Sequence, residues 1–189
     1  GGGGGGDGDS CNNAIDANTG ANAFDTSDNT DSGFGDPDES QCEGTYLDWA
    51  NSPDEWFRWT ATASGSATFS TCDAGSYDTS LVLYSGSSCS SLTQIACNGD
   101  AEGGSGCQSY YSEISGVSVT SGSVYYVRIG GWRAATGPGT LTISVEGGGD
   151  PTGGCCVGTN CSVQTAADCA SMGGDYLGDG SSCAGNPCG

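Results

Sequence analysis

The chain has 189 residues and a formal net charge of −20, because 23 acidic residues stand against three arginines, with no lysine and no histidine. A surface this acidic repels nucleic-acid phosphates and anionic lipid head groups, which excludes both as expected partners. Hydrophobic residues amount to 34% and no apolar run is long enough for a membrane span, so we expect a modest core of sheets and turns.

The chain opens with a glycine-rich segment, residues 1–10, and a similar stretch recurs at residues 147–154. Both are glycine runs followed by aspartate, just before a cysteine-bearing region, as expected of flexible linkers. The sequence therefore predicts two domains, residues 11–146 and residues 155–189. Because glycine offers only backbone groups, we also expect the first segment to dock on a strand or groove of a neighbouring copy. Its contact positions would be Gly1, Gly2 and Gly3.

Residues 11–55 are polar, low in branched apolar residues and acidic, since 13 of the 23 acidic residues lie in residues 1–55. We expect a long loop that covers the following strands, with one or two short strands of its own. Cys11 and Cys42 would tie this loop, and Phe24 and Phe34 would anchor it.

The acidic loop at residues 25–40 is a candidate calcium site, because Ca²⁺ takes six to eight oxygen ligands from flexible loops. The spacing of its acids is not that of an EF-hand. The alternative is a solvated surface with aspartates in turns. The hypothesis is one calcium ion held by Asp25, Asp28, Asp31, Asp36, Asp38 and Glu39.

Residues 56–146 alternate with a period of two between apolar and polar side chains, which predicts half-buried antiparallel strands. Phe57 and Trp59 share one face of the first strand, opposite Trp56 and Arg58. Later segments repeat the pattern, and glycine- and serine-rich turns separate them. No helix is expected here, and we predict an all-β fold, a jelly-roll-like antiparallel β-sandwich. The later inward sets are Leu81 and Leu83; Tyr125, Val127 and Ile129; and Leu141, Ile143 and Val145.

Aromatic residues outside the core pattern are candidate contacts for a glycan or a subunit. The alternation makes Trp59 a core residue, whereas Trp49 and Trp132 lie in loop-like sequence. Aromatic and arginine residues are enriched at interfaces. We therefore predict a contact site at Trp49, Trp132 and Arg133.

The twelve cysteines form an even set, and without histidine most mixed zinc sites are impossible. Disulfides are the expected chemistry, which indicates an extracellular or cell-surface location. In the first half we expect Cys89–Cys97, Cys11–Cys42 and Cys72–Cys107, one of 15 possible connectivities. In the second half, the adjacent Cys155 and Cys156 should reach different partners. The complete set is Cys11, Cys42, Cys72, Cys89, Cys97, Cys107, Cys155, Cys156, Cys161, Cys169, Cys183 and Cys188.

The last 35 residues are too few for an apolar core of their own, so disulfides must hold them. Thr165 and Asp168 resemble a capping box and Gly173 can end the turn. The sequence predicts one short helix between them, with Cys169 and Met172 facing inward.

Three stretches, YDTSLVLY at 77–84, CNGD at 97–100 and GSVYYVRIGGW at 122–132, are followed by GPGTLTI at 137–143. In this order they resemble the bacterial pre-peptidase C-terminal domain family over residues 56–146. The resemblance implies a jelly-roll sandwich with a non-catalytic role in secretion, attachment or targeting, and relatives that bind collagen, carbohydrate or calcium. Residues 155–188 resemble a small cysteine-rich repeat of secreted bacterial surface proteins.

Two non-enzymatic functions follow from these observations. The first is an extracellular structural protein whose copies self-associate into a filament or surface layer, favoured by the disulfides and glycine linkers. The alternative is a carbohydrate- or protein-binding module of a larger secreted hydrolase, with calcium as its only expected cofactor. Nucleophilic catalysis usually needs histidine or lysine as a base, so we do not expect an enzyme.

Overall fold

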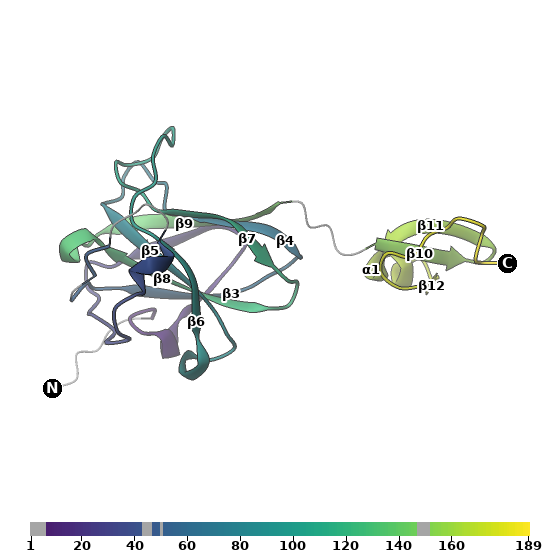
Figure 1. The fold of residues 1–189 in the computed structure, drawn as a ribbon, viewed down its shortest axis with the longest axis horizontal. Helices are drawn as coiled ribbons and strands as arrows, with labels where there is room; N and C mark the ends of the chain where they lie inside the picture. The colour runs from purple at the N-terminus through teal and green to yellow at the C-terminus, as the bar shows by residue number, and fades with distance from the viewer. Residues whose placement is uncertain (1–6, 43–46, 50, 147–151) are drawn as a thin grey trace.

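The computed structural model describes residues 7–42, 47–49, 51–146 and 152–189 (Figure 1). Gly1, Gly2 and Gly3, the predicted docking positions, lie outside these ranges. No helix in the described part of the chain has the length and hydropathy that a membrane crossing requires. The strands are β1 (Ile15–Ala17), β2 (Gly20–Asp25), β3 (Glu55–Thr60), β4 (Gly65–Ser70), β5 (Thr79–Ser85), β6 (Thr93–Asn98), β7 (Glu113–Val119), β8 (Val124–Gly131), β9 (Pro138–Glu146), β10 (Thr152–Val157), β11 (Asn160–Thr165) and β12 (Asp175–Tyr176). One α-helix, α1 (Ala166–Ser171), and four 3₁₀ turns, η1 (Cys11–Asn13), η2 (Glu39–Gln41), η3 (Cys89–Ser91) and η4 (Trp132–Ala134), complete the elements.

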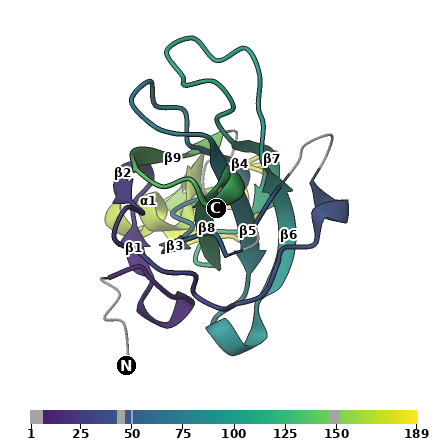
Figure 2. The ribbon, with the colours of Figure 1, turned by 90° about the vertical axis from the view of Figure 1, so that its left-hand side faces the viewer.

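Nine of these strands form two sheets, which confirms the predicted all-β fold. The five-stranded sheet has the order β1-β3-β8-β5-β6 and the four-stranded sheet the order β2-β9-β4-β7 (Figure 2). All neighbours are antiparallel except β1 and β3, which pair in parallel. The one helix predicted for the C-terminal region is also present.

The core between the two sheets follows the predicted alternation. Phe57 and Trp59 from β3 pack there with Phe69 from β4 and with the predicted residues of β5, β8 and β9. Phe24, predicted as an anchor, joins this cluster. Burying apolar side chains from both sheets in one cluster is the main favourable term for the fold.

The outer face of the five-stranded sheet is also buried, which the alternation did not predict. Trp56, Val82 and Tyr126 point outward, yet residues of the N-terminal part of the chain cover them, among them Cys11, Cys42, Leu47 and Trp49. Phe34 lies on this cover, with its ring centroid 4.8 Å from that of Trp56 and 5.6 Å from that of Tyr84. Strands β5 and β8 are therefore buried on both faces, because the long N-terminal loop adds a third layer.

The C-terminal sheet has the order β11-β10-β12 and packs against α1. Thr165 caps α1 as predicted, since its side chain accepts a hydrogen bond from the Asp168 amide. Cys169 is fully buried, but Met172 is 45% exposed, so the prediction that it faces inward is wrong. Thr152–Gly154, expected in the linker, begin β10. The division of the chain into two domains stays a prediction.

Six disulfides join all twelve cysteines, and none is free. Cys72–Cys107 is as predicted, and Cys155 and Cys156 do reach different partners. The predicted Cys89–Cys97 and Cys11–Cys42 bridges are wrong, because Cys11 and Cys42 both bond to the β5–β6 region. These two bonds hold the N-terminal loop against the outer sheet face, a long-range contact that cysteine spacing does not show. The bonds are Cys11–Cys89, Cys42–Cys97, Cys72–Cys107, Cys155–Cys169, Cys156–Cys188 and Cys161–Cys183.

Candidate functional site

Three buried carboxylates hold the start of the acidic loop. Asp9 accepts hydrogen bonds from the amide and hydroxyl of Thr30. Asp54 does the same for the amide (3.1 Å) and hydroxyl (2.8 Å) of Ser32. Glu55 accepts from the amide of Asp25 at 3.1 Å. Because each acceptor is a buried side chain and each donor belongs to the loop, these bonds fold the loop onto the sheet.

Arg128 on β8 is buried beside these acids. Its Nε donates to the carboxylate of Asp54, and its Nη1 donates to the carbonyl of Gly35 at 2.7 Å. The guanidinium carbon lies 4.5 Å from the ring centroid of Trp49 and 5.4 Å from that of Trp56. A buried charge needs a partner and hydrogen bonds to offset its desolvation, and Asp54, the Gly35 carbonyl and two indoles supply most of them. The remaining terminal nitrogen, Nη2, makes no hydrogen bond within the described residues and lies 3.8 Å from the Asp31 carboxylate.

The strand alternation does not predict this network. Arg128 alternates with the core residues Val127 and Ile129, so the pattern places it on the outer, solvated face. Only the loop that covers this face makes it a core residue. One sequence feature does point to it: Arg128 is one of three arginines in the chain, and it lies on a strand otherwise rich in apolar residues.

Burial shifts the ionisation of two of these acids. Desolvation raises the pKa of Asp54, although Arg128 and the bonds from Ser32 act in the opposite direction. Desolvation, with a smaller contribution from the charge of Asp25, raises the pKa of Glu55 to about 7 from its usual 4.5. Both carboxylates accept hydrogen bonds within the fold, so their first role is to position the loop.

Glu55→Gln is expected to make the protein more stable above neutral pH. The folded state holds a proton on Glu55 between about pH 4.5 and 7 that the unfolded state has already lost, so stability falls as the pH rises through this window. Glutamine does not titrate, so the variant does not lose stability in this window. The difference in the free energy of unfolding between Glu55→Gln and wild type should therefore grow by roughly 2 kcal/mol between about pH 5 and pH 8. Urea unfolding at both pH values measures it. Parallel pH profiles of the two proteins would contradict the assignment.

The predicted calcium ligands do not converge in this structure. All six are exposed, and several are engaged in local turns. Hydrogen bonds from Ser27 and from Ser40 hold the pKa of Asp25 and of Asp38, respectively, below the usual range. Among the described residues, the one group of three ligand atoms within 4.8 Å of one another is Cys156, Cys161 and Cys188, whose sulfurs are in disulfides. Calcium binding at Asp25, Asp28, Asp31, Asp36, Asp38 and Glu39 stays a prediction.

The predicted aromatic contact site separates into a buried and a surface part. Trp49 is only 4% exposed, so its prediction as a surface residue is wrong: it packs on the Arg128 guanidinium. Trp132 is half-buried and Arg133 exposed, with the guanidinium carbon 5.4 Å from the Trp132 ring and an ion pair to Asp48 at 3.7 Å. Arg133 and Ala134 both have positive φ, 51° and 60°. Such backbone strain is often found at functional sites.

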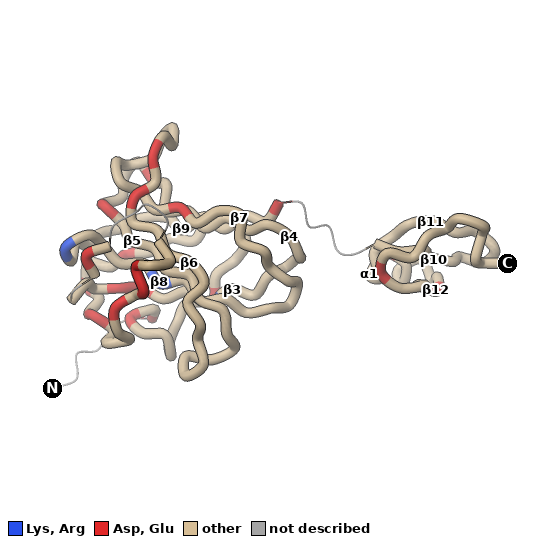
Figure 3. Tube along the Cα trace, viewed as in Figure 1, with Lys and Arg blue, Asp and Glu red and all other residues tan. Residues whose placement is uncertain are grey.

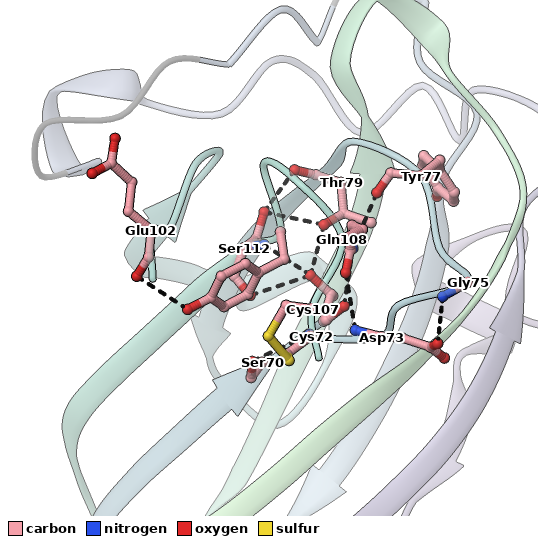
Figure 4. The surroundings of a disulfide bond; sticks show 12 residues. Ser70, Cys72, Asp73, Gly75, Tyr77, Thr79, Glu102, Cys107, Gln108 and Ser112 are labelled. Carbon is pink, nitrogen blue, oxygen red and sulfur yellow. Dashed lines mark hydrogen bonds between the residues drawn. A yellow bond between two sulfur atoms is a disulfide. The ribbon is translucent and has the colours of Figure 1, made fainter. Parts of the chain in front are cut away.

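A second surface feature is the loop between β6 and β7, held by Cys72–Cys107 (Figure 4). Gln108 anchors it: its side-chain oxygen accepts from the Asp73 amide, and its nitrogen donates to the carbonyls of Thr71 and Tyr77. The loop forms a cavity of about 340 Å³ lined by residues 101–104 and 107–111. At this cavity Tyr110 is 60% exposed with φ of 60°, which presents an aromatic ring to solvent.

Comparisons with known proteins add little to this geometry. No protein-family model matches the chain, and no curated protein does. Among solved structures the chain is similar to the pre-peptidase C-terminal domain of a collagenase from Bacillus anthracis, with 12% identity and a TM-score of 0.42. The similarity covers 69% of this chain and 94% of that domain. A likeness at this level assigns neither family nor function, so the resemblance stays a prediction.

Proposed function

We propose that the chain is a non-catalytic extracellular structural protein whose copies associate into a larger assembly, such as a filament or a surface layer. Its cysteines are all in disulfides, as is typical of proteins in oxidising compartments. Its buried acids accept hydrogen bonds that hold the fold together. The observation that supports association is the absence of charged residues from two of the strands at the edges of the sheets.

Edge strands leave one row of backbone N–H and C=O groups unpaired, and proteins usually protect them with charges, bulges or covering segments. In the described part of the chain, the six edge strands are β1, β2, β6, β7, β11 and β12. Four of them contain an acidic residue: Asp16 in β1, Asp25 in β2, Glu113 in β7 and Asp175 in β12. The other two, β6 and β11, contain no charged residue in a chain with a net charge of −20.

The uncharged edge strands β6 and β11 are the main support for this proposal. Each is six residues long and exposes a β-branched side chain, Ile95 in β6 at 38% and Val163 in β11 at 56%. Beside β6 lies a groove of about 430 Å³ lined by Gln41 and by residues of β6 and β7. Ile114 and Val117 are among them, but so is the acidic Glu113, so the charge-free surface at β6 is the strand itself. Between strongly acidic copies, contact is most favourable where charge is absent.

Sedimentation velocity over a concentration series, with electron microscopy of the same samples, tests this function. The expected result is concentration-dependent association of the intact protein, promoted by salt because salt screens repulsion between acidic copies. A monomer at every concentration and salt level would refute the structural role.

The alternative, a carbohydrate- or protein-binding module, is favoured by one observation, the exposed Tyr110 beside the 340 Å³ cavity. Exposed aromatic rings are common anchors at binding sites. A monomeric protein that is retained on immobilised polysaccharide or collagen, and loses retention as Tyr110→Ala, would favour this function over the first.

A further inference from the structure

The open edge of β11 is regular along its whole length. β10 and β11 pair in six consecutive positions without a register shift, from Thr152 opposite Thr165 to Val157 opposite Asn160. The two-residue turn between them begins at Gly158 with φ of +62°, the positive φ that tight hairpin turns need. Figure 1 shows β11 at the edge of this sheet, with β10 between it and β12.

The hairpin register determines which backbone groups of β11 point outward. The residues that flank a two-residue turn, Val157 and Asn160, form a hydrogen-bonded pair. Pairs alternate along an antiparallel ladder, so Asn160, Ser162 and Gln164 bond to β10. The N–H and C=O groups of Cys161 and Val163, and the N–H of Thr165, therefore face away from the sheet.

The opposite side of β10 is already in use. β12 pairs with it, and beyond β12 the amides of Leu177 and Gly180 donate to the carbonyls of Gly154 and Thr152 at 2.8 and 2.9 Å. β11 is therefore the long open edge of this sheet in the described part of the chain. Figure 3 shows it free of acidic and basic positions, whereas acids occur on α1 and β12.

The other neutral edge, β6, is less suited to accept a strand. Its register with β5 shifts between Leu83 and Tyr84, so Ile95 is an inserted residue, and such bulges interrupt pairing. η2 also lies beside β6 (Figure 2), where the Gln94 side chain bonds both the amide and the carbonyl of Asp38. β11 has neither protection.

We propose that β11 pairs antiparallel with β11 of a second copy, with Val163 of one copy opposite Val163 of the other. In this register the outward-facing groups meet: the two Val163 residues exchange N–H···O=C bonds, and Cys161 opposes Thr165. The β-branched Val163 side chains then lie beside each other across the two-fold axis, a favourable cross-strand pair. A second copy fits because this contact is self-complementary and brings no charged strand residue of either copy against the other.

This inference rests on the proposed function, because it names one surface through which the copies associate. Pairing of this kind closes a dimer, so growth into a longer assembly would use a further surface.

Val163→Pro provides the test, because it removes an outward N–H that the hairpin does not use. Proline is tolerated at such edge positions. The control Val163→Thr keeps the β-branched shape and the N–H, and Val163→Lys leaves the backbone intact but adds a protective charge. We expect Val163→Pro and Val163→Lys to weaken dimer formation about tenfold or more, and Val163→Thr to leave it nearly unchanged. Sedimentation velocity measures all three, with disulfide content and circular dichroism as the test of folding.

Amide hydrogen exchange provides a second readout. Exchange at Cys161, Val163 and Thr165 should slow as the protein concentration rises, whereas exchange at Asp16 in the acidic edge strand β1 should not change. If wild type associates but the proline and lysine variants associate equally well, and these amides show no concentration dependence, the β11 interface is wrong and the proposed function stands. If wild type does not associate at all, both are wrong.

Discussion

Arg128→Leu is expected to lower the free energy of unfolding by about 3–5 kcal/mol, because it leaves Asp54 buried without its cation. Asp54 is fully buried and already has a raised pKa through desolvation. The variant also removes the donor to the Gly35 carbonyl and the cation that Trp49 and Trp56 enclose. Urea unfolding followed by tryptophan fluorescence measures the change in midpoint at constant slope.

Arg58→Leu is the matched control, because Arg58 is also a strand arginine paired with an aspartate. Its side chain is 49% exposed and that of Asp16 74% exposed, so the loss should stay below about 1 kcal/mol. Adding Asp54→Asn to Arg128→Leu should recover part of the stability, since the stranded charge is then gone. Equal losses for Arg128→Leu and Arg58→Leu would show that the buried pair does not hold the loop.

Removing the Cys155–Cys169 bond, as Cys155→Ala with Cys169→Ala, is expected to unfold the C-terminal segment while the sandwich remains. These two cysteines are fully buried, and they are the buried apolar side chains of the described residues 152–189. The bond spans a separation of 14 residues and contributes about 3 kcal/mol, against a segment with almost no core to offset its loss. In two-dimensional NMR spectra, the signals of residues 152–189 should collapse to random-coil positions.

The control is the double substitution Cys72→Ala with Cys107→Ala, which releases the loop between β6 and β7. The sandwich keeps its core cluster of Phe57, Trp59, Phe69 and their neighbours, so its dispersed signals should persist apart from those of the loop. Dispersed signals from residues 152–189 in the first variant would mean that the other two disulfides suffice to hold this segment.

Local pattern predicted much of the fold. The alternation in residues 56–146 identified the inward side chains of β3, β5, β8 and β9, because a strand turns every second residue to the same face. The Thr165 cap and the short helix were equally local. The prediction that Met172 faces inward was wrong, because so small a segment has too little interior to bury a side chain that follows the end of α1.

What depended on distant contacts could not be predicted in this way. The covering layer made from the described residues 7–42, 47–49 and 51–54 turned Arg128, Asp54 and Glu55 into core residues and buried Trp49. The same layer set the Cys11–Cys89 and Cys42–Cys97 bonds. Cysteine spacing limits a pairing by chain length alone, whereas a disulfide needs two Cβ atoms about 4 Å apart, which the folded chain decides.

The sequence by itself determined the strand pattern, the oxidised state expected of the cysteines and the strong acidity of the surface, because these follow from composition and period. Only the tertiary structure decided which strands lie at the edges of their sheets. β6 and β11 are neutral in the sequence, but neutrality matters only at an unpaired edge, where backbone groups lack partners. Whether a strand lies at an edge depends on the spatial order of the strands in the sheet, and contacts between residues far apart in the chain determine that order.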